Sequence, residues 1–222
     1  PIVYDYADYY PQSSSAYFKN PIMKRITHGL VKKVTEYALH RSDVVITVCD
    51  SHAELIRRID PTKSVYVVPN GVDFEVFKPI DKREAVEQLA IGKLKVDTEL
   101  TLLYVGSIDE WVDLETPLKA IRQLKREGYR VCLVVVGGSH GGYYMRYVRS
   151  LVKSCDLEDD VVLTGFVSHN QILLYMNAAD AALAPYRIVI KNDGTPLKVL
   201  EYLACQKIVL CNKLPEMMRR FG

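Results

Sequence analysis

The fold is decided by the stretch VCLVVVGG, which runs from Val131 to Gly138. Its six apolar residues in a row are typical of a strand buried on both faces, because such a run has no polar side to turn toward water. The two glycines after it carry no Cβ, so a ligand can approach the backbone closely at the strand end. This stretch therefore predicts an interior strand followed by a binding loop.

Strands and helices alternate around this stretch from Leu100 onward. Such alternation is typical of right-handed βαβ crossovers and of a parallel sheet covered by helices on both faces. We therefore predict an α/β fold with a doubly wound, Rossmann-like parallel sheet. The expected elements are strands to Val105, at Val131–Val136, Val161–Thr164, Ala181–Ala184 and Ile208–Cys211, and helices at Pro117–Glu127, about Gly142–Cys155, after Ser168 and from Pro196.

The first hundred residues predict a separate group of elements. The expected strands cover Pro1–Tyr6, Val44–Val48 and Val65–Val68, and a turn covers Pro11–Ser15. Helices are expected from Ile22, from near His52 with Ser51 and Glu54 as a capping box, and after a cap formed by Asp81 with Glu84; Gly92 would end the last one, with a loop through Asp97.

The helix expected from Ile22 has two kinds of face. Its apolar residues Ile26, Leu30, Val34 and Tyr37 recur at helical spacing, while several basic residues collect elsewhere. The basic residues form either a solvated face or a surface for anionic lipid headgroups, which would make a peripheral membrane contact.

Composition excludes several classes of protein. A formal net charge of +2 lacks the concentrated basic face of a nucleic-acid binder. Five cysteines without C-x-x-C spacing indicate reduced, mostly buried thiols of a cytoplasmic protein. The apolar runs are too short for a transmembrane helix.

Chemistry concentrates in the segment from Asn192 to Ala204. Thr195 is a plausible N-cap and Pro196 suits the first helical position, so free N–H groups near Gly194 would form a cradle for an anion. Lys198 and Glu201 lie three residues apart on one helix face, where they form either a surface ion pair or part of that site.

This segment resembles retaining glycosyltransferases, especially family 4. Asp193 through Glu201 is similar to the family's E-x7-E signature, with Asp193 in place of the first Glu. Further similar motifs follow in the family's order, namely Asn70-Gly71-Val72-Asp73, Tyr104-Val105-Gly106, Val134 to Gly138, Val162 to Val167, and Glu201 to Val209. The resemblance implies the GT-B architecture of two Rossmann-like domains.

The resemblance also implies roles for single residues. Glu201 would accept hydrogen bonds from the ribose hydroxyls, Asp193 would bind the transferred sugar, and Lys198 would offset charge on the leaving diphosphate. Gly194, Thr195 and Pro196 would hold diphosphate and sugar, Phe166 and Val167 would frame the base, and Gly106, Ser107 and Gly138 would complete the nucleotide site.

Three departures from the family pattern stand out. Ser107 and Trp111-Val112 replace an Arg and a Lys-Gly pair that usually lie near the diphosphate, so Lys198, Arg187 or Lys191 are the local candidates for offsetting its charge. Trp111 either stacks on a ligand ring or packs in the core. Ala7 replaces a His of the acceptor domain, so Asp5 or Asp8 is the candidate for its polar role. The resemblance also implies a part of a longer protein, with residues 1–77 from the acceptor domain and hinge and 78–222 from a truncated donor domain.

We therefore expect a metal-independent transferase without a cofactor, which moves a hexosyl group from a nucleotide-diphosphate sugar to a saccharide or lipid-linked acceptor with retention. The fragment itself is expected to be impaired in transfer. A cytoplasmic protein is expected, either free or at the inner face of the membrane. The alternatives are a non-catalytic nucleotide-sugar-binding subunit and an epimerase or phosphorylase of the same architecture.

Overall fold

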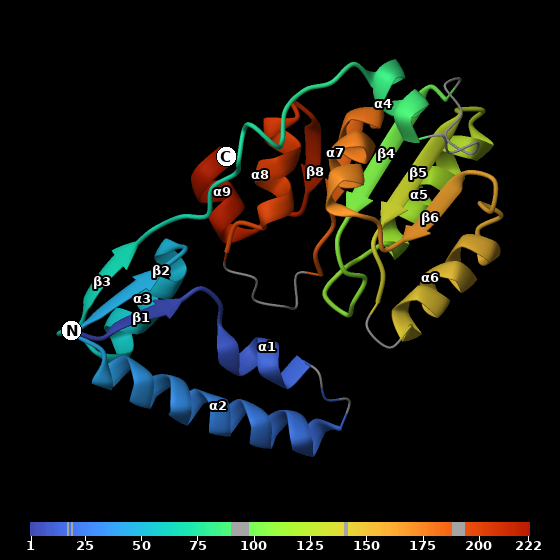
Figure 1. The fold of residues 1–222 in the computed structure, drawn as a ribbon. Coiled ribbons are helices and arrows are strands. Elements are labelled where there is room, and N and C mark those ends of the chain that lie inside the picture. The colour runs from blue at the N-terminus through green and yellow to red at the C-terminus, as the bar shows by residue number, and fades with distance from the viewer. Residues whose placement is uncertain (17, 19, 90–97, 140–141, 188–193) are drawn as a thin grey trace. The chain divides into compact units, whose positions relative to one another are not determined.

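The computed structural model describes residues 1–16, 18, 20–89, 98–139, 142–187 and 194–222 (Figure 1). Two compact units divide the chain: unit 1 consists of Pro1–Asn70, Asn192–Thr195 and Leu214–Gly222, and unit 2 of Gly71–Lys191 and Pro196–Lys213. Each unit contains its own parallel sheet. The domain boundary expected after residue 77 stays a prediction.

Unit 1 is built on a three-stranded sheet in the order β1-β2-β3. Its strands are β1 (Val3–Tyr6), β2 (Val44–Thr47) and β3 (Ser64–Val67), and its helices are α1 (Tyr10–Ala16), α2 (Pro21–Arg41), α3 (Asp50–Ile59) and α9 (Pro215–Phe221). Tyr6, Leu39, Val45 and Ile56 form its small core. The Thr47 hydroxyl donates to the Tyr6 carbonyl at 2.9 Å and thereby ties the ends of β1 and β2 together.

Unit 2 has the doubly wound parallel sheet that the sequence predicts. The strand order is β6-β5-β4-β7-β8, with β4 (Leu100–Val105) in the centre beside β5 (Val131–Val136). The remaining elements are β6 (Val161–Gly165), β7 (Ala181–Ala184), β8 (Ile208–Cys211), α4 (Lys82–Leu89), α5 (Glu115–Arg126), α6 (Tyr143–Ser154), α7 (His169–Ala178) and α8 (Leu197–Ala204).

Alternate residues of β4 and β5 point to two separate apolar clusters. Leu103 and Val134 belong to the cluster that contains buried residues of α4, α7 and α8, while Leu102 and Leu133 belong to the one that α5 and α6 complete. Both faces of the sheet are therefore covered, which explains why β5 is apolar at all six positions.

Two sequence predictions of local structure are wrong. The expected turn at Pro11–Ser15 is the helix α1, where Pro11 stands in the first turn and its missing N–H costs no hydrogen bond. Helix α3 begins at Asp50 after Cys49, without a side-chain cap, so the capping box at Ser51 is not formed. The helix expected from Ile22 is α2, and its buried residues are Thr35 and Leu39.

Other predicted boundaries agree with the structure. The Asp81 carboxylate accepts hydrogen bonds from the N–H groups of Arg83 and Glu84 at 2.9 and 3.2 Å, as a cap of α4 should. Gly92 and Asp97 lie outside the described residues.

Glycines join the strand ends of unit 2. Gly137 has a φ of +128°, and a Cβ at this position would collide with the carbonyl oxygen of Gly106 in the neighbouring loop. A backbone atom cannot move away as the end of a side chain can. Gly137 is therefore needed for the two loops to lie against each other.

We predict that Gly137→Ala lowers the free energy of unfolding by about 2 kcal/mol or more, because backbone strain and the collision act together. Gly128→Ala should cost less, about 1 kcal/mol, since its φ is +92° but no atom lies within 4 Å of the new Cβ. Gly29→Ala, in open space within α2, should stabilise by about 0.5 to 1 kcal/mol. Urea denaturation of the three variants measures this order, and equal stability of Gly137→Ala and wild type would contradict the packing argument.

Candidate functional site

The loops after β4, β5 and β6 meet at the carboxyl ends of the strands. The Gly106 N–H donates to the Val136 carbonyl at 2.9 Å, the Ile108 N–H to the Gly138 carbonyl at 2.9 Å, and the Gly137 N–H to the Gly165 carbonyl at 2.8 Å. The predicted glycine loops therefore form one continuous surface, at the edge of the sheet where ligands of parallel α/β folds bind.

Helix α8 is fixed to this edge by Tyr202. The side chain is fully buried, and its hydroxyl oxygen accepts a hydrogen bond from the Val105 N–H, the last of β4, at 2.8 Å. Because β4 is the central strand, this contact brings the first turns of α8 beside the loop that begins at Gly106. The side chains of Lys198 and Glu201 are thereby positioned at the strand ends.

Lys198 is held between aromatic rings and a glycine. Its Nζ donates to the Tyr104 hydroxyl at 3.2 Å and lies 4.4 Å from the Tyr104 ring centroid and 5.7 Å from that of Tyr186. A Cβ on Gly106 would approach Nζ to 2.5 Å, so a larger residue there would displace the ammonium group from its present place. Within the described part of the chain, no carboxylate forms an ion pair with Lys198.

The Tyr104 hydroxyl connects Lys198 with the loop after β4. It donates to the Ser107 carbonyl at 2.6 Å while it accepts from Lys198. Burial raises the pKa of Tyr104, so the hydroxyl stays protonated and keeps this donor role. Ser107 thus contributes its carbonyl to holding the loop.

Burial favours the neutral forms of the Lys198 and Glu201 side chains on α8. It lowers the pKa of Lys198 to about 8, against an opposing effect of the Glu201 carboxylate. It also raises the pKa of Glu201, and the charges of His169 and Lys198 act in the opposite direction. Both residues are only partly shielded from solvent. Such shifts cluster at functional sites, where ligands supply the missing charge partners.

The start of α8 differs from the prediction by one residue. Pro196 is the N-cap, with φ −62° and ψ 132°, and Leu197 is the first helical residue, so Thr195 is not the cap. Proline fixes φ but not ψ, and here ψ is extended. The first helical N–H groups therefore belong to Leu197 and Lys198, which moves the predicted anion cradle along the chain by one residue.

Gly194 and Thr195 group with unit 1. A Cβ on Gly194 would lie 3.9 Å from Cγ2 of Val48, just after β2. Thr195 is 4% exposed, and its hydroxyl has no hydrogen-bond partner among the described residues. Asp193, the predicted sugar-binding residue, lies outside the described residues.

Phe166 lies against the loop after β5. A Cβ on Gly138 would come within 2.7 Å of the Phe166 ring, so these two predicted residues are direct neighbours. The Phe166 side chain is 70% exposed, whereas Val167 packs against the core. An exposed aromatic ring beside a glycine loop is able to contact a planar base.

The two carboxylates proposed for the acceptor side belong to unit 1. Asp5 is an exposed residue of β1, and Asp8 follows this strand with its carboxylate accepting from the Tyr9 N–H at 2.7 Å. The predicted catalytic residues are thus divided between the two units, with Lys198 in unit 2.

Sequence reasoning missed Tyr104, Tyr186 and His169. Tyr104 stands in the strand that resembles the family's F-V-G motif, and its hydroxyl was the only signal of a polar role. No sequence motif marks Tyr186 or His169. Tyr186 lies near Lys198 and His169 near Glu201 only because of the tertiary packing. Trp111 packs against the apolar cluster on the α5 and α6 side, which favours its core reading.

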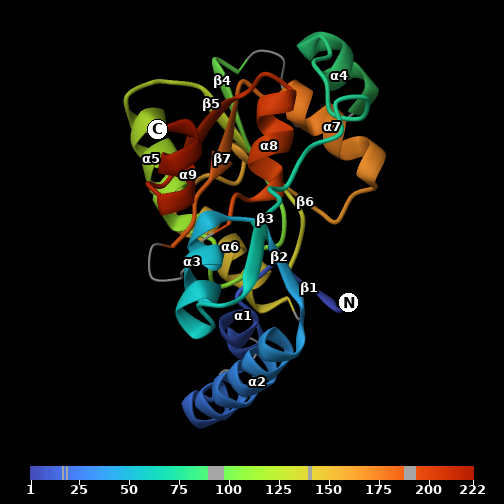
Figure 2. The same cartoon turned by 90° about the vertical axis from the view of Figure 1, so that its left-hand side faces the viewer.

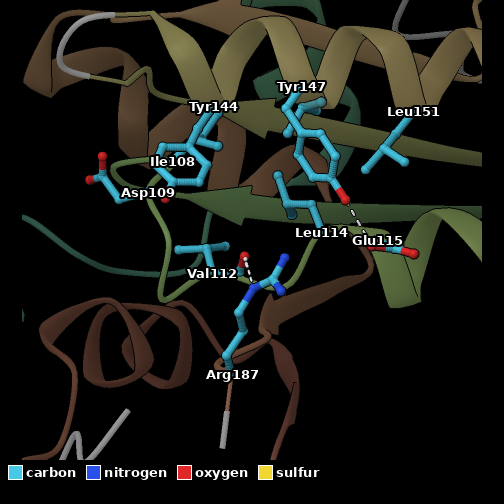
Figure 3. A pocket seen from close by; sticks show the side chains of 10 residues that line it. Ile108, Asp109, Val112, Leu114, Glu115, Tyr144, Tyr147, Leu151 and Arg187 are labelled. Atoms are coloured by element: carbon cyan, nitrogen blue, oxygen red, sulfur yellow. Dashed lines mark hydrogen bonds between the residues drawn. The ribbon is translucent and has the colours of Figure 1, made fainter. Parts of the chain in front are cut away.

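A small hollow of about 10 Å³, partly open to solvent, lies on that same side (Figure 3). The Tyr147 hydroxyl donates to Glu115 at 2.8 Å, Lys119 donates to Glu115 at 2.7 Å, and Arg187 Nε donates to the Val112 carbonyl at 3.4 Å. These bonds hold the pKa of Glu115 below its ordinary value. Arg187, one of the cations that the sequence offers for the diphosphate, lines this hollow, and the other lining residues were not predicted as site residues.

The structure also bears on the sequence expectations for metal binding, cysteines and membrane spans. Nowhere in the described ranges do three or more His, Cys, Asp or Glu side chains gather as metal ligands. All five cysteines are free and four of them are buried, which confirms the expectation that most of them are buried. Of the helices built from described residues, none is long and apolar enough to cross a membrane.

Relatives of known activity cover much of the chain. Alpha-monoglucosyldiacylglycerol synthase of Streptococcus pneumoniae is 27% identical over 192 residues, which are 86% of this chain and 42% of the relative. D-inositol 3-phosphate glycosyltransferase of Kineococcus radiotolerans is 34% identical over 152 residues, which are 66% of this chain and 33% of the relative. The chain thus spans less than half the length of these relatives.

Solved structures show the same fold. Sucrose-phosphate synthase from Thermosynechococcus elongatus has a TM-score of 0.70 at 22% identity, covering 98% of this chain and 51% of that protein. HepE of Anabaena, solved with UDP-glucose, has a TM-score of 0.71 at 18% identity, covering 99% and 55%. The fold is that of GT-B glycosyltransferases with Rossmann-like domains.

The sequence profile of one family covers most of unit 2 and extends into α9. It matches residues 86–221, which is more than half of the chain, and it describes the glycosyl transferases group 1. The chain therefore belongs to the glycosyl transferases group 1 family.

Proposed function

We propose that this chain carries the donor site of a retaining hexosyltransferase of family 4 type, which uses a nucleotide-diphosphate sugar. One observation carries the proposal: Lys198, without a carboxylate partner among the described residues, lies at the end of the central strand and one turn before Glu201. A cation held in this way is suited to receive an anionic ligand.

The diphosphate is the ligand we assign to this cation. The N–H groups that begin α8 and its helix dipole add to the positive potential near Lys198. Ser107 and Trp111-Val112 stand where the family usually has basic residues. Lys198 supplies charge that these positions lack, and it stabilises the negative charge on the leaving diphosphate when its bond to the sugar breaks.

The nucleoside occupies the surface beside Lys198 in this proposal. Glu201 accepts hydrogen bonds from the two ribose hydroxyls, because a carboxylate offers two acceptor oxygens. Phe166 and Gly138, which are direct neighbours, contact the base together with Val167. Asp193 binds the transferred sugar in this proposal. The diphosphate and the sugar are held by the segment Gly194–Pro196.

Transfer requires an acceptor, which the proposal assigns to unit 1. The acceptor oxygen forms the new bond to the anomeric carbon while the diphosphate leaves, and the acceptor proton goes to Asp5 or Asp8. The acceptor is a hydroxyl group of a saccharide or of a lipid-linked molecule. The protein acts in the cytoplasm or at the inner face of the membrane in this proposal. Because the chain spans part of its relatives' length, the separate chain binds donor but transfers sugar poorly.

A non-catalytic nucleotide-sugar-binding subunit is the second candidate. The replacement of the usual basic residues at Ser107 and Trp111, and of His by Ala7, favours it. Turnover of donor by the complete protein separates the two candidates, since a binding subunit gives none.

We predict that Glu201→Gln lowers nucleotide affinity about tenfold or more, because one carboxylate oxygen becomes a donor and a charge-assisted hydrogen bond of about 1.5 to 3 kcal/mol is lost. Isothermal titration calorimetry measures the change. A 2′,3′-dideoxy nucleotide lacks both hydroxyls and should bind wild type and variant alike. Equal weakening of both nucleotides, or of neither, would refute the ribose assignment.

Nucleoside diphosphate affinity should fall about tenfold between pH 7 and pH 9. The diphosphate favours the protonated amine, and the pKa of Lys198 is lowered to about 8, so the charged form is lost across this range. Lys198→Met should bind more weakly at pH 7 and give a flat profile, whereas Lys153→Met, on the exposed side of α6, should keep the wild-type profile. An unchanged slope in Lys198→Met would show that another group titrates.

Donor affinity should not depend on a metal ion, because Lys198 and the start of α8 supply the positive charge. Fluorescence titration with EDTA and without it measures this. A large loss of affinity in EDTA that Mn²⁺ restores would overturn the metal-free account.

A further inference from the structure

The ammonium group of Lys198 uses one of its three N–H donors within the described part of the chain. The acceptor is the Tyr104 hydroxyl, at 3.2 Å, so two donors remain for the oxygens of a ligand. The four-carbon stem of lysine has many rotamers, and fixing one of them on binding costs free energy. A residue that holds the ammonium group in place beforehand lowers this cost.

Tyr104 is held rigidly and turns an acceptor toward Lys198. Its side chain is 1% exposed and belongs to the central strand β4. Its hydroxyl donates its single proton to the Ser107 carbonyl at 2.6 Å, so its lone pairs are what it offers to Lys198. Burial raises the pKa of Tyr104, which keeps the proton on the hydroxyl. The loop after β4 therefore fixes the direction of the bond between Lys198 and Tyr104.

The second aromatic ring beside Lys198 is fixed by backbone contacts. Tyr186 follows β7, pairs with Val112 in an isolated antiparallel bridge, and donates its N–H to the Asn212 side chain at 2.7 Å. Its ring centroid lies 5.7 Å from Nζ of Lys198. Figures 1 and 2 show α8 beside β7 and β8, so the helix that carries Lys198 packs on the strand that leads to Tyr186. Lys198 thus lies between two fixed rings, and Tyr104 in addition accepts a hydrogen bond.

The titratable groups around Lys198 come from β4, the segments after β4 and β7, and the helices α7 and α8. They are Tyr104, Asp109, Tyr186, His169, Glu201 and Tyr202. Burial raises the pKa of the three tyrosines, so they stay neutral in the range where Lys198 titrates. The Glu201 carboxylate favours the protonated amine, and the charge of His169 acts on Glu201. Removal of the Tyr104 hydroxyl therefore changes the hydrogen bonding of Lys198 without removing a charge.

We propose that Tyr104 is a positioning residue for the donor diphosphate: its hydroxyl holds the Lys198 ammonium group at the end of β4, so that the two other N–H donors face phosphate oxygens. The proposal rests on the proposed function, because it takes the diphosphate as the ligand of Lys198. Tyr104 itself does not touch the ligand. The motif that this strand resembles has phenylalanine at this position, so the hydroxyl is the group that this chain adds.

A double-mutant cycle of Tyr104→Phe and Lys198→Met tests this coupling. Isothermal titration calorimetry is carried out with uridine diphosphate and guanosine diphosphate, and the one that wild type binds more tightly is the probe. At pH 7, Tyr104→Phe should lower the affinity for the probe about fivefold, because a hydrogen bond to the charged amine is lost while the ring remains. In the Lys198→Met background the same substitution should change affinity by less than about twofold.

The pH profile of affinity separates positioning from a merely structural role. In wild type, affinity for the probe should fall between pH 7 and pH 9 as the Lys198 amine loses its charge. In Tyr104→Phe the charged amine lacks an acceptor, which lowers the pKa of Lys198 further. The same fall should therefore occur about one pH unit lower. Lys198→Met should give a flat profile with and without the Tyr104 hydroxyl.

Tyr147→Phe is the matched control. It removes another tyrosine hydroxyl of unit 2, which donates to Glu115 at 2.8 Å, and it should leave the affinity and the pH profile as in wild type. The nucleoside that matches the probe lacks phosphates and should bind Tyr104→Phe and wild type alike in NMR titrations. Circular dichroism and urea denaturation check that each variant stays folded.

Two results would overturn the positioning role alone. An equal loss of affinity from Tyr104→Phe in the presence and absence of Lys198 assigns the hydroxyl to the loop contact with Ser107. Unchanged affinity and an unchanged pH profile in Tyr104→Phe show that the ring is sufficient. In both cases wild type still binds the probe and Lys198→Met binds it more weakly, so the donor site stands. A folded wild type that binds neither nucleoside diphosphate refutes the proposed function, and the positioning role with it.

Discussion

The hydrogen bond between the Val105 N–H and the Tyr202 hydroxyl is the contact on which the candidate site depends. The Val105 N–H lies at the buried end of β4, and a buried N–H needs a hydrogen-bond partner. Tyr202 supplies it from a position 97 residues later in the chain, at 2.8 Å. The same bond attaches α8 to the end of β4. It therefore helps to position Lys198, one turn before Tyr202, and Glu201, the residue directly before it.

Close backbone approach makes this arrangement possible. A Cβ on Gly137 would collide with the backbone of Gly106, so the two loops can lie against each other only with glycine at position 137. Nζ of Lys198 lies beside Gly106 and the Tyr104 ring. The ammonium group is then surrounded by ring faces and one hydroxyl, which stabilise a cation less than a carboxylate would. Burial lowers the pKa of Lys198 for this reason, and a diphosphate would restore the charge balance.

The sequence predicts those parts of the fold and site that depend on local patterns. The alternation of strands and helices predicts the doubly wound sheet, and the apolar run of β5 with the glycines at the strand ends predicts an interior strand and binding loops after the strands. The predicted N-cap of α8 is one residue too early because proline fixes φ and leaves ψ open, and the ψ angle of Pro196 is extended. Tyr104 was read as part of a strand, since its partner Lys198 is 94 residues away.

A crystal structure of the chain with a bound nucleoside diphosphate tests the central claim most directly. The account predicts diphosphate oxygens at hydrogen-bond distance from Lys198 Nζ and from the first N–H groups of α8, with both ribose hydroxyls on Glu201. A diphosphate bound beside Arg187 in the hollow next to α6, or one that leaves Lys198 on Tyr104 without contact, would contradict it.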